Sequence, residues 1–107
     1  MRYLMTTNAS GAVPDEKLFA EMGAFIEEMT AKGVLLATGG LEPAGIRVES
    51  SGGEIVVTDG PFAEAKEAAA GFALVEVRSK EEAIELARRF RGIAGDGTSV
   101  VQQVFGS

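Results

Sequence analysis

The stretch FALVEVRSKEEAIELARRF, residues 72–90, places a strand directly before a helix and decides the fold. Its first part is apolar and rich in β-forming side chains, which predicts a strand over 72–77. Ser79 and Glu82 then have the spacing of a capping box, in which the serine caps the first helical turn and the glutamate reaches back. Apolar positions recur after it at helical spacing, so the helix is predicted to continue to about Arg91.

The segments on either side of this stretch complete a sheet. Acidic residues open the first predicted helix and Gly33 follows it, which is typical of helix ends. A turn at residues 50–53 indicates a hairpin. The remaining predicted elements are strands over 2–6, 34–38, 46–49, 54–58 and 100–105 and a helix over 15–32. This order predicts an α+β fold: a ferredoxin-like β-α-β-β-α-β antiparallel sheet with both helices on one face and an inserted hairpin.

The composition fits a single domain over residues 1–107 and excludes several classes of function. Lys and Arg total 10 against 16 Asp and Glu, a net charge of −6, which argues against nucleic acid as a partner. Cysteine and histidine are both missing, so thiolate chemistry and the commonest metal ligand are excluded, and we expect no metal site and no cofactor. We find no signal peptide and no membrane-spanning run, so we expect a cytoplasmic location and no membrane partner.

The predicted strands carry large apolar side chains on both faces. Tyr3 alternates with Leu4, and Val75 alternates with Leu74. Two helices can cover only one face of a sheet, and soluble monomers rarely expose an apolar patch larger than a few hundred Å². We therefore predict a homodimer in which two sheets pack face to face and form a dimeric α+β barrel.

The segment TDGPFAEAKE, residues 58–67, holds the candidate site. Asp59 ends a predicted strand, where a sheet projects functional groups into a cleft, and Phe62 could form one wall of it. Lys66 could neutralise Asp59 or bind an anionic ligand, and Arg47 is a second candidate anion binder. General-base catalysis would require Asp59 to be buried or to lie beside another carboxylate. The alternative is structural, because an aspartate at a turn accepts hydrogen bonds from nearby backbone N–H groups.

This segment resembles the DGPF branch of the YCII-related family. The likeness is carried by residues 40–43, 56–67 and 71–72 and by residues 81–85 of the second predicted helix, and it extends over nearly the whole chain. The resemblance implies a dimeric α+β barrel, in agreement with the predicted order of elements. Some relatives of the YCII type are enzymes that act on small ring compounds with a His–Asp pair, and this chain has no histidine to supply one. DGPF members also occur with extracytoplasmic-function sigma factors, which implies a regulatory context.

Three hypotheses about function follow. The first is a dimeric barrel that binds a small polar or anionic ligand in a cleft near Asp59. The second is a lyase- or isomerase-type enzyme with Asp59 as general base and Lys66 or Arg47 to hold charge. The third is an interaction module linked to sigma-factor regulation. Both ligand hypotheses require a pocket bordered by Phe62 and Asp59.

Overall fold

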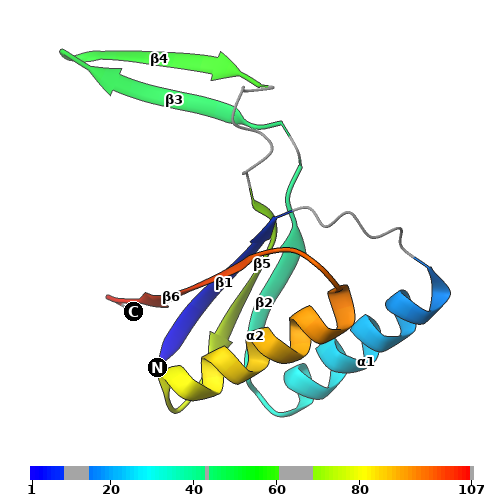
Figure 1. Ribbon diagram of the computed structural model, residues 1–107. Helices are drawn as coiled ribbons and strands as arrows, with labels where there is room; N and C mark the ends of the chain where they lie inside the picture. Colours follow the sequence, from blue (N-terminus) through cyan, green and yellow to red (C-terminus); the bar gives the residue numbers. More distant parts are fainter. Residues whose placement is uncertain (9–14, 43, 61–68, 107) are drawn as a thin grey trace.

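The computed structural model describes residues 1–8, 15–42, 44–60 and 69–106. Within them the chain forms strands and helices in the order that the sequence predicts (Figure 1). The elements are β1 (Arg2–Asn8), α1 (Glu16–Ala31), β2 (Leu35–Gly40), β3 (Ile46–Ser51), β4 (Glu54–Asp59), β5 (Ala69–Glu76), α2 (Lys80–Ala94) and β6 (Ser99–Val104).

Four strands form one antiparallel sheet in the order β2-β5-β1-β6, and α1 and α2 lie on the same face of it (Figure 1). α1 connects β1 to β2, with β5 between them, and α2 connects β5 to β6, with β1 between them. This is the ferredoxin-like arrangement of an α+β fold, and the predicted fold class is confirmed. β3 and β4 form a separate two-stranded sheet, which is the inserted hairpin.

Both helices begin at side chains that satisfy backbone N–H groups of the first turn. Asp15 accepts from the Leu18 N–H at 2.8 Å before α1, and Ser79 accepts from the Glu82 N–H at 3.1 Å before α2. The Glu82 carboxylate accepts from the Arg78 N–H at 3.2 Å rather than from that of the cap residue, so the capping box is shifted by one residue.

Most element boundaries differ from the sequence prediction by no more than two residues, and two of them differ by three. α2 continues past Arg91 to Ala94, because one glycine inside a helix costs little, and the helix ends only at Gly95 with its positive φ of 87°. β5 begins at Ala69 rather than at residue 72, because its glycine and alanine residues continue the ladder with β1 and β2.

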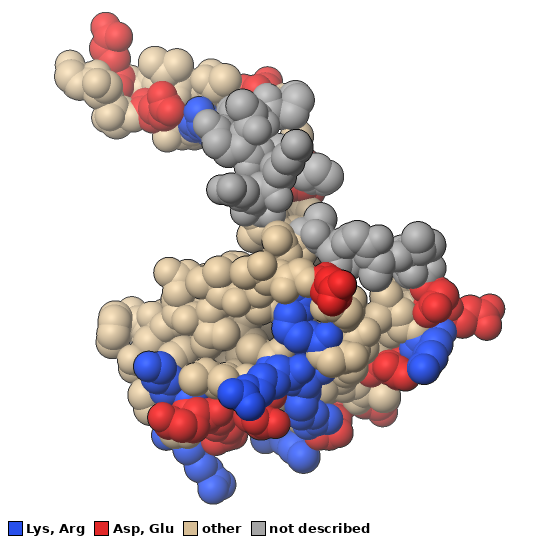
Figure 2. Space-filling view, viewed as in Figure 1, with Lys and Arg blue, Asp and Glu red and all other residues tan. Residues whose placement is uncertain are grey.

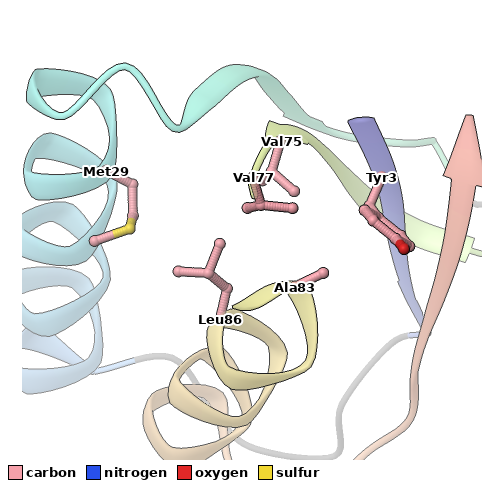
Figure 3. Packing of buried hydrophobic residues seen from close by; sticks show 6 residues of the cluster. All are labelled: Tyr3, Met29, Val75, Val77, Ala83 and Leu86. Carbon is pink, nitrogen blue, oxygen red and sulfur yellow. The ribbon is translucent and has the colours of Figure 1, made fainter. Parts of the chain in front are cut away.

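The buried core lies between the sheet and the helices (Figure 3). It consists of Tyr3, Val75 and Val77 on the side of the sheet, Met29 from α1, and Ala83 and Leu86 from α2. Tyr3 and Val75 are directly paired between β1 and β5, so both side chains point to the same face. This pairing fixes which side chains of the whole sheet turn toward the helices.

The opposite face of the sheet has no cover among the described residues, and we call it the open face. Leu4 is paired with Leu74 on one side and with Gln102 on the other, so these three side chains point away from the helices. Val100 belongs to the same face and is 48% exposed. Charged side chains gather over the helices, whereas the surface of the four-stranded sheet is largely free of charge in the view of Figure 2. The open face therefore has the apolar character that the sequence predicts.

The β3–β4 hairpin projects away from the sheet and the helices (Figure 1). All of its strand residues are exposed, and the radius of gyration of 15.9 Å exceeds the ~13 Å expected of a compact chain of this length. Gly52 and Gly53 both have positive φ, which a two-residue hairpin turn requires and which glycine adopts without strain. At its base Leu41 N–H donates to Ala70 C=O at 2.8 Å, so the chain leaves and re-enters the sheet at neighbouring positions.

The hairpin is amphipathic although nothing described covers it. The register pairs Ile46 with Asp59 and Val48 with Val57, and paired residues share a face. We call the side formed by Ile46, Val48, Ser50, Ile55, Val57 and Asp59 the apolar face of the hairpin. The other side carries Arg47, Glu49, Ser51, Glu54, Val56 and Thr58. Ile55 on the apolar face is 70% exposed, which leaves it almost as accessible as in an unfolded chain.

Candidate functional site

A cavity of about 210 Å³ lies between the sheet and the helices. Each helix presents one apolar stripe to it, because the sequence repeats apolar positions at intervals of three and four residues. The residues that line it include Met5, Met22, Phe25, Ala87, Phe90 and Ser99. Protein interiors are normally close-packed, so an unfilled volume of this size is a candidate binding site. It suits a ligand smaller than the drug-sized molecules that fill pockets of roughly 300–1,000 Å³.

The few polar side chains of the cavity come from the strands. Thr7 and Thr38 line it and are already engaged, since the Thr38 hydroxyl donates to Phe72 C=O at 2.9 Å and the Thr7 hydroxyl donates to Thr98 C=O at 3.3 Å. Ser99 also lines it, and its hydroxyl oxygen is buried without a hydrogen-bond partner in the described part of the chain. An unpartnered buried hydroxyl indicates a position where a ligand group can bind.

The residues predicted from sequence lie elsewhere in the part of the chain that the structure describes. Asp59 is exposed at the end of β4, and Arg47 is exposed on β3, where it forms an ion pair with Glu49 at 3.7 Å. Paired residues alternate between the two faces, so Asp59 and Arg47 point to opposite sides of the hairpin. Neither is among the described residues that line the cavity. The structure therefore does not bring these two candidates together within one chain.

Phe62 and Lys66 lie outside the described residues, as does Pro61 of the DGPF motif. Their roles as a wall and as a charge partner remain predictions. The N–H groups that a turn-capping Asp59 carboxylate would accept from follow it by two or three residues and also lie outside the described residues, so this alternative stays a prediction as well. Asp59 thus remains a candidate both for turn capping and for a role in ligand binding or catalysis.

The charged side chains over the helices form a structural cluster. Arg89 of α2 donates to Glu28 of α1 at 2.9 and 3.2 Å, and Lys32 donates to the same carboxylate at 3.2 Å. The hydrogen bond from Arg89, followed by that from Lys32, lowers the pKa of Glu28 from 4.5 to about 2. The same contact raises the pKa of Arg89. This cluster joins the outer surfaces of the two helices and faces solvent. We therefore interpret it as a structural interaction between α1 and α2.

Residues 1–8, 15–42, 44–60 and 69–106 show neither a cluster of metal-ligating side chains nor a membrane-spanning helix. They contain no group of three acidic, histidine or cysteine side chains arranged to hold a metal ion. No helix among them is both long enough and apolar enough to cross a bilayer.

Sequence reasoning missed the cavity and one residue beside it. Its lining residues read as ordinary core positions, since the same helical spacing is typical of a filled core and of an unfilled one. In the sequence, Arg91 follows Arg88 and Arg89 near the end of a helix, where the helix dipole favours any cation. In the structure the Arg91 Nε and Nη1 atoms are buried, and no described residue forms a hydrogen bond with them. The pattern of charges gives no signal of that burial.

The family model of the YCII-related domain matches residues 1–104 of this chain. This chain belongs to the YCII-related family. An uncharacterized protein of Rhizobium meliloti (strain 1021) is 36% identical over 84 residues, which cover 77% of this chain and 68% of that protein. The family assignment made from the DGPF segment is thereby confirmed at the level of the family.

A solved structure supports the fold. It is 5-chloro-2-hydroxyhydroquinone dehydrochlorinase (TftG) from Burkholderia phenoliruptrix AC1100, in complex with 2,5-dihydroxybenzoquinone. The similarity has a TM-score of 0.53 at 13% sequence identity and covers all of this YCII-related chain and 96% of the other. At that identity the similarity establishes a shared α+β fold.

Proposed function

We propose that this YCII-related chain binds a small organic molecule in the cavity between the sheet and the helices. The observation that carries the proposal is the apolar cavity of about 210 Å³ in the place where a packed core would otherwise lie. Apolar walls with a few polar groups are the usual composition of a small-molecule site. The side chains of Phe25 and Phe90 favour a ring, and the hydroxyl of Ser99 favours a polar substituent.

The dehydrochlorinase of similar fold supports a hydroxylated six-membered ring as the chemical class. Its structure holds 2,5-dihydroxybenzoquinone, which is small, planar and polar at its rim. A lyase-type activity is the corresponding reaction class. Because this chain has no histidine to act as a general base, binding without turnover is the form that we propose first.

The test is a thermal-shift screen of small acids and phenols on three proteins. Wild type should be stabilised by about 2.7 kcal/mol when a ligand is present at 100 times its Kd. Ala87→Leu should lose that shift, because Ala87 lines the cavity and a larger side chain occupies it. Ala24→Leu on the exposed side of α1 is the matched control and should retain it. Equal shifts in the two variants would contradict binding in the cavity.

A second candidate site lies on the hairpin, with Asp59 at its centre. The observation in its favour is that Asp59 shares the apolar face with Ile46 and Val57. A partner that covers this face would also take Asp59 out of water, which is the environment a general base needs. Arg47, Phe62 and Lys66 remain the candidates to hold charge or to form a wall. In the same screen Asp59→Asn should abolish the shift if the hairpin binds the ligand, and should leave it unchanged if the cavity does.

The partner that we propose for these surfaces is a second copy of the chain. The open face and the apolar face of the hairpin are unpartnered in the same described chain, and a two-fold dimer uses each surface twice. Four strands about 4.8 Å apart and six residues long present roughly 400 Å² of sheet. Two such faces, with two hairpin faces and the surfaces they cover, amount to on the order of 1,600 Å², the size of a standard stable interface. Sedimentation at micromolar concentration should give the mass of a homodimer, and a monomer mass would contradict the proposal.

A further inference from the structure

Arg91 differs from the other two arginines of α2. Arg89 is paired with Glu28 at 2.9 Å, and Arg88 is exposed to solvent. The Nε and Nη1 atoms of Arg91 are buried, and no acceptor in the described part of the chain bonds to them. The guanidinium carbon lies 5.0 Å from the centroid of the Phe90 ring. This cation–π contact offsets the positive charge only in part and gives the N–H groups no hydrogen-bond acceptor. A partly buried guanidinium with two unbonded nitrogens has the donors and the charge to bind an anion.

The surroundings place this guanidinium next to the cavity. Phe90, which Arg91 stacks on, is one of the lining residues of the cavity. Ser99 lines it as well and is directly paired with Thr7, where the end of β1 meets the start of β6. Gly97, which lies against the guanidinium, belongs to the same junction, and Asn8 lies beside Gly97. Arg91 is not itself a lining residue, but the ring beneath its guanidinium, Phe90, and the unpartnered Ser99 hydroxyl both line the cavity, whose walls are otherwise apolar.

Gly97 keeps the guanidinium in this position. A Cβ atom on Gly97 would collide with Arg91 Nη1 and would lie 3.3 Å from Asn8 Oδ1. The Asn8 oxygen accepts from the Thr98 N–H at 2.9 Å, so it is engaged with the backbone and leaves Arg91 without that acceptor. The absence of a side chain at residue 97 therefore provides the space that the cation occupies.

We propose that the molecule bound in the cavity carries a carboxylate, and that Arg91 recognises it with help from the Ser99 hydroxyl. This inference rests on the proposed binding of a small molecule in the cavity and adds the chemical class of its polar group. A carboxylate oxygen accepts from a guanidinium N–H in a charge-assisted hydrogen bond, which is stronger than one between neutral groups. Aromatic and methionine side chains would hold the apolar part of the same molecule.

A purely structural role for Arg91 makes a different prediction. A cation in the last turn of a helix stabilises the helix dipole whether or not a ligand is present. Removing the charge would then lower the melting temperature equally with a charged and with a neutral ligand. Discrimination between two ligands of the same shape therefore separates recognition from stabilisation.

The experiment measures the affinity of benzoate and of benzamide by calorimetry. These two probes share a ring and a planar substituent and differ in charge. Wild type should bind benzoate at least about tenfold more tightly than benzamide, and Arg91→Gln should bring the two affinities together by weakening benzoate alone. Arg88→Gln removes a charge from an exposed position of the same helix and should preserve the preference. Gly97→Ala keeps every charge but displaces the guanidinium, so it should also reduce the preference, and it decides the matter if Arg91→Gln does not fold.

The outcomes separate this inference from the proposed function. If both probes bind equally to wild type and Ala87→Leu blocks both, the cavity is a binding site and the role of Arg91 is refuted. A preference that persists in both Arg91→Gln and Gly97→Ala refutes it as well. If neither probe binds at millimolar concentration, the proposed binding in the cavity fails, and the inference fails with it.

Discussion

The four-stranded sheet and the β3–β4 hairpin are built from similar apolar strands, but only the sheet has a covered face. On the sheet Val75 is 4% exposed because α1 and α2 pack over it, whereas on the hairpin Ile46 is 66% exposed. An isolated two-stranded hairpin is at best marginally stable in water. The sheet and helices therefore bury a core of their own, whereas nothing among the described residues of this chain covers the apolar face of the hairpin, which can be buried only against a partner.

The largest difference between the two regions should come from core deletion. We expect Leu86→Ala to lower the free energy of unfolding by about 2–5 kcal/mol, because Leu86 is part of the buried cluster under the sheet. Ile55→Ala on the hairpin removes a similar amount of apolar surface from a side chain that is already exposed. Urea denaturation of dilute protein, at a concentration that favours the monomer, measures both. A loss for Ile55→Ala as large as that for Leu86→Ala would show that the hairpin is covered within one chain.

The two faces of the hairpin provide a sharper comparison, because neighbouring valines point to opposite sides. Val57→Ser places a hydroxyl on the apolar face, and Val56→Ser makes the same change on the face that carries Arg47 and Glu49. If a second copy covers the apolar face, Val57→Ser should weaken the dimer by about tenfold or more, because burying an unpartnered hydroxyl is costly. Val56→Ser should change it little. Sedimentation over a range of concentrations gives both dissociation constants, and equal values would remove the apolar face from the interface.

Loss of a helix cap should act on the covered region alone. We expect Ser79→Ala to cost about 1 kcal/mol of stability, because the Glu82 N–H loses its acceptor at the start of α2. Asp15→Ala makes the equivalent change at α1 and should cost a similar amount. Amide hydrogen exchange should show faster exchange throughout the sheet and helices in both variants. If the exchange rates of the hairpin amides rise by the same factor, the hairpin unfolds together with the sheet and helices as one cooperative unit.

The smallest effect should come from pH. Hydrogen bonds from Arg89 and Lys32 lower the pKa of Glu28 from 4.5 to about 2 in the folded chain. A carboxyl with a depressed folded pKa stabilises the fold above pH 4.5, and this contribution is lost as the pH falls toward 2. The difference in melting temperature between wild type and Glu28→Gln should therefore shrink between pH 5 and pH 2. Because the cluster faces solvent, added salt should reduce it as well, and a difference that is constant with pH would contradict the assignment.

The fold could be predicted from the sequence because its signals are local. The capping residue Ser79, the apolar spacing of the helices and the glycine turn at residues 52 and 53 each specify an element, and the order of elements leaves few topologies. Strand boundaries are harder to predict at glycine and alanine, because these residues lack the branched or aromatic side chains that are typical of strands. The start of β5 at Ala69 depends on pairing with β1 and β2, which a single segment does not encode.

The site could not be predicted in the same way, because it depends on what packs against what. The turn motif directed attention to Asp59, and the structure places that residue on an exposed hairpin. The cavity arises from how closely two helices approach the sheet, and residues such as Phe90 have the same pattern in a filled core. Arg91 stands beside two other arginines in sequence, and only the packing of Gly97 and the neighbouring strand ends buries its donors.

The hydrogen bond between Leu41 and Ala70 has a consequence for protein engineering. Since the chain departs from β2 and returns to β5 at adjacent points, the register of these two strands is independent of what lies between them. The entropy of closing such an excursion rises only slowly with its length. The segment from residue 42 to residue 68 can therefore be exchanged for a short linker or for a longer insert. A chain trimmed in this way would retain the sheet, the helices and the cavity as a minimal scaffold.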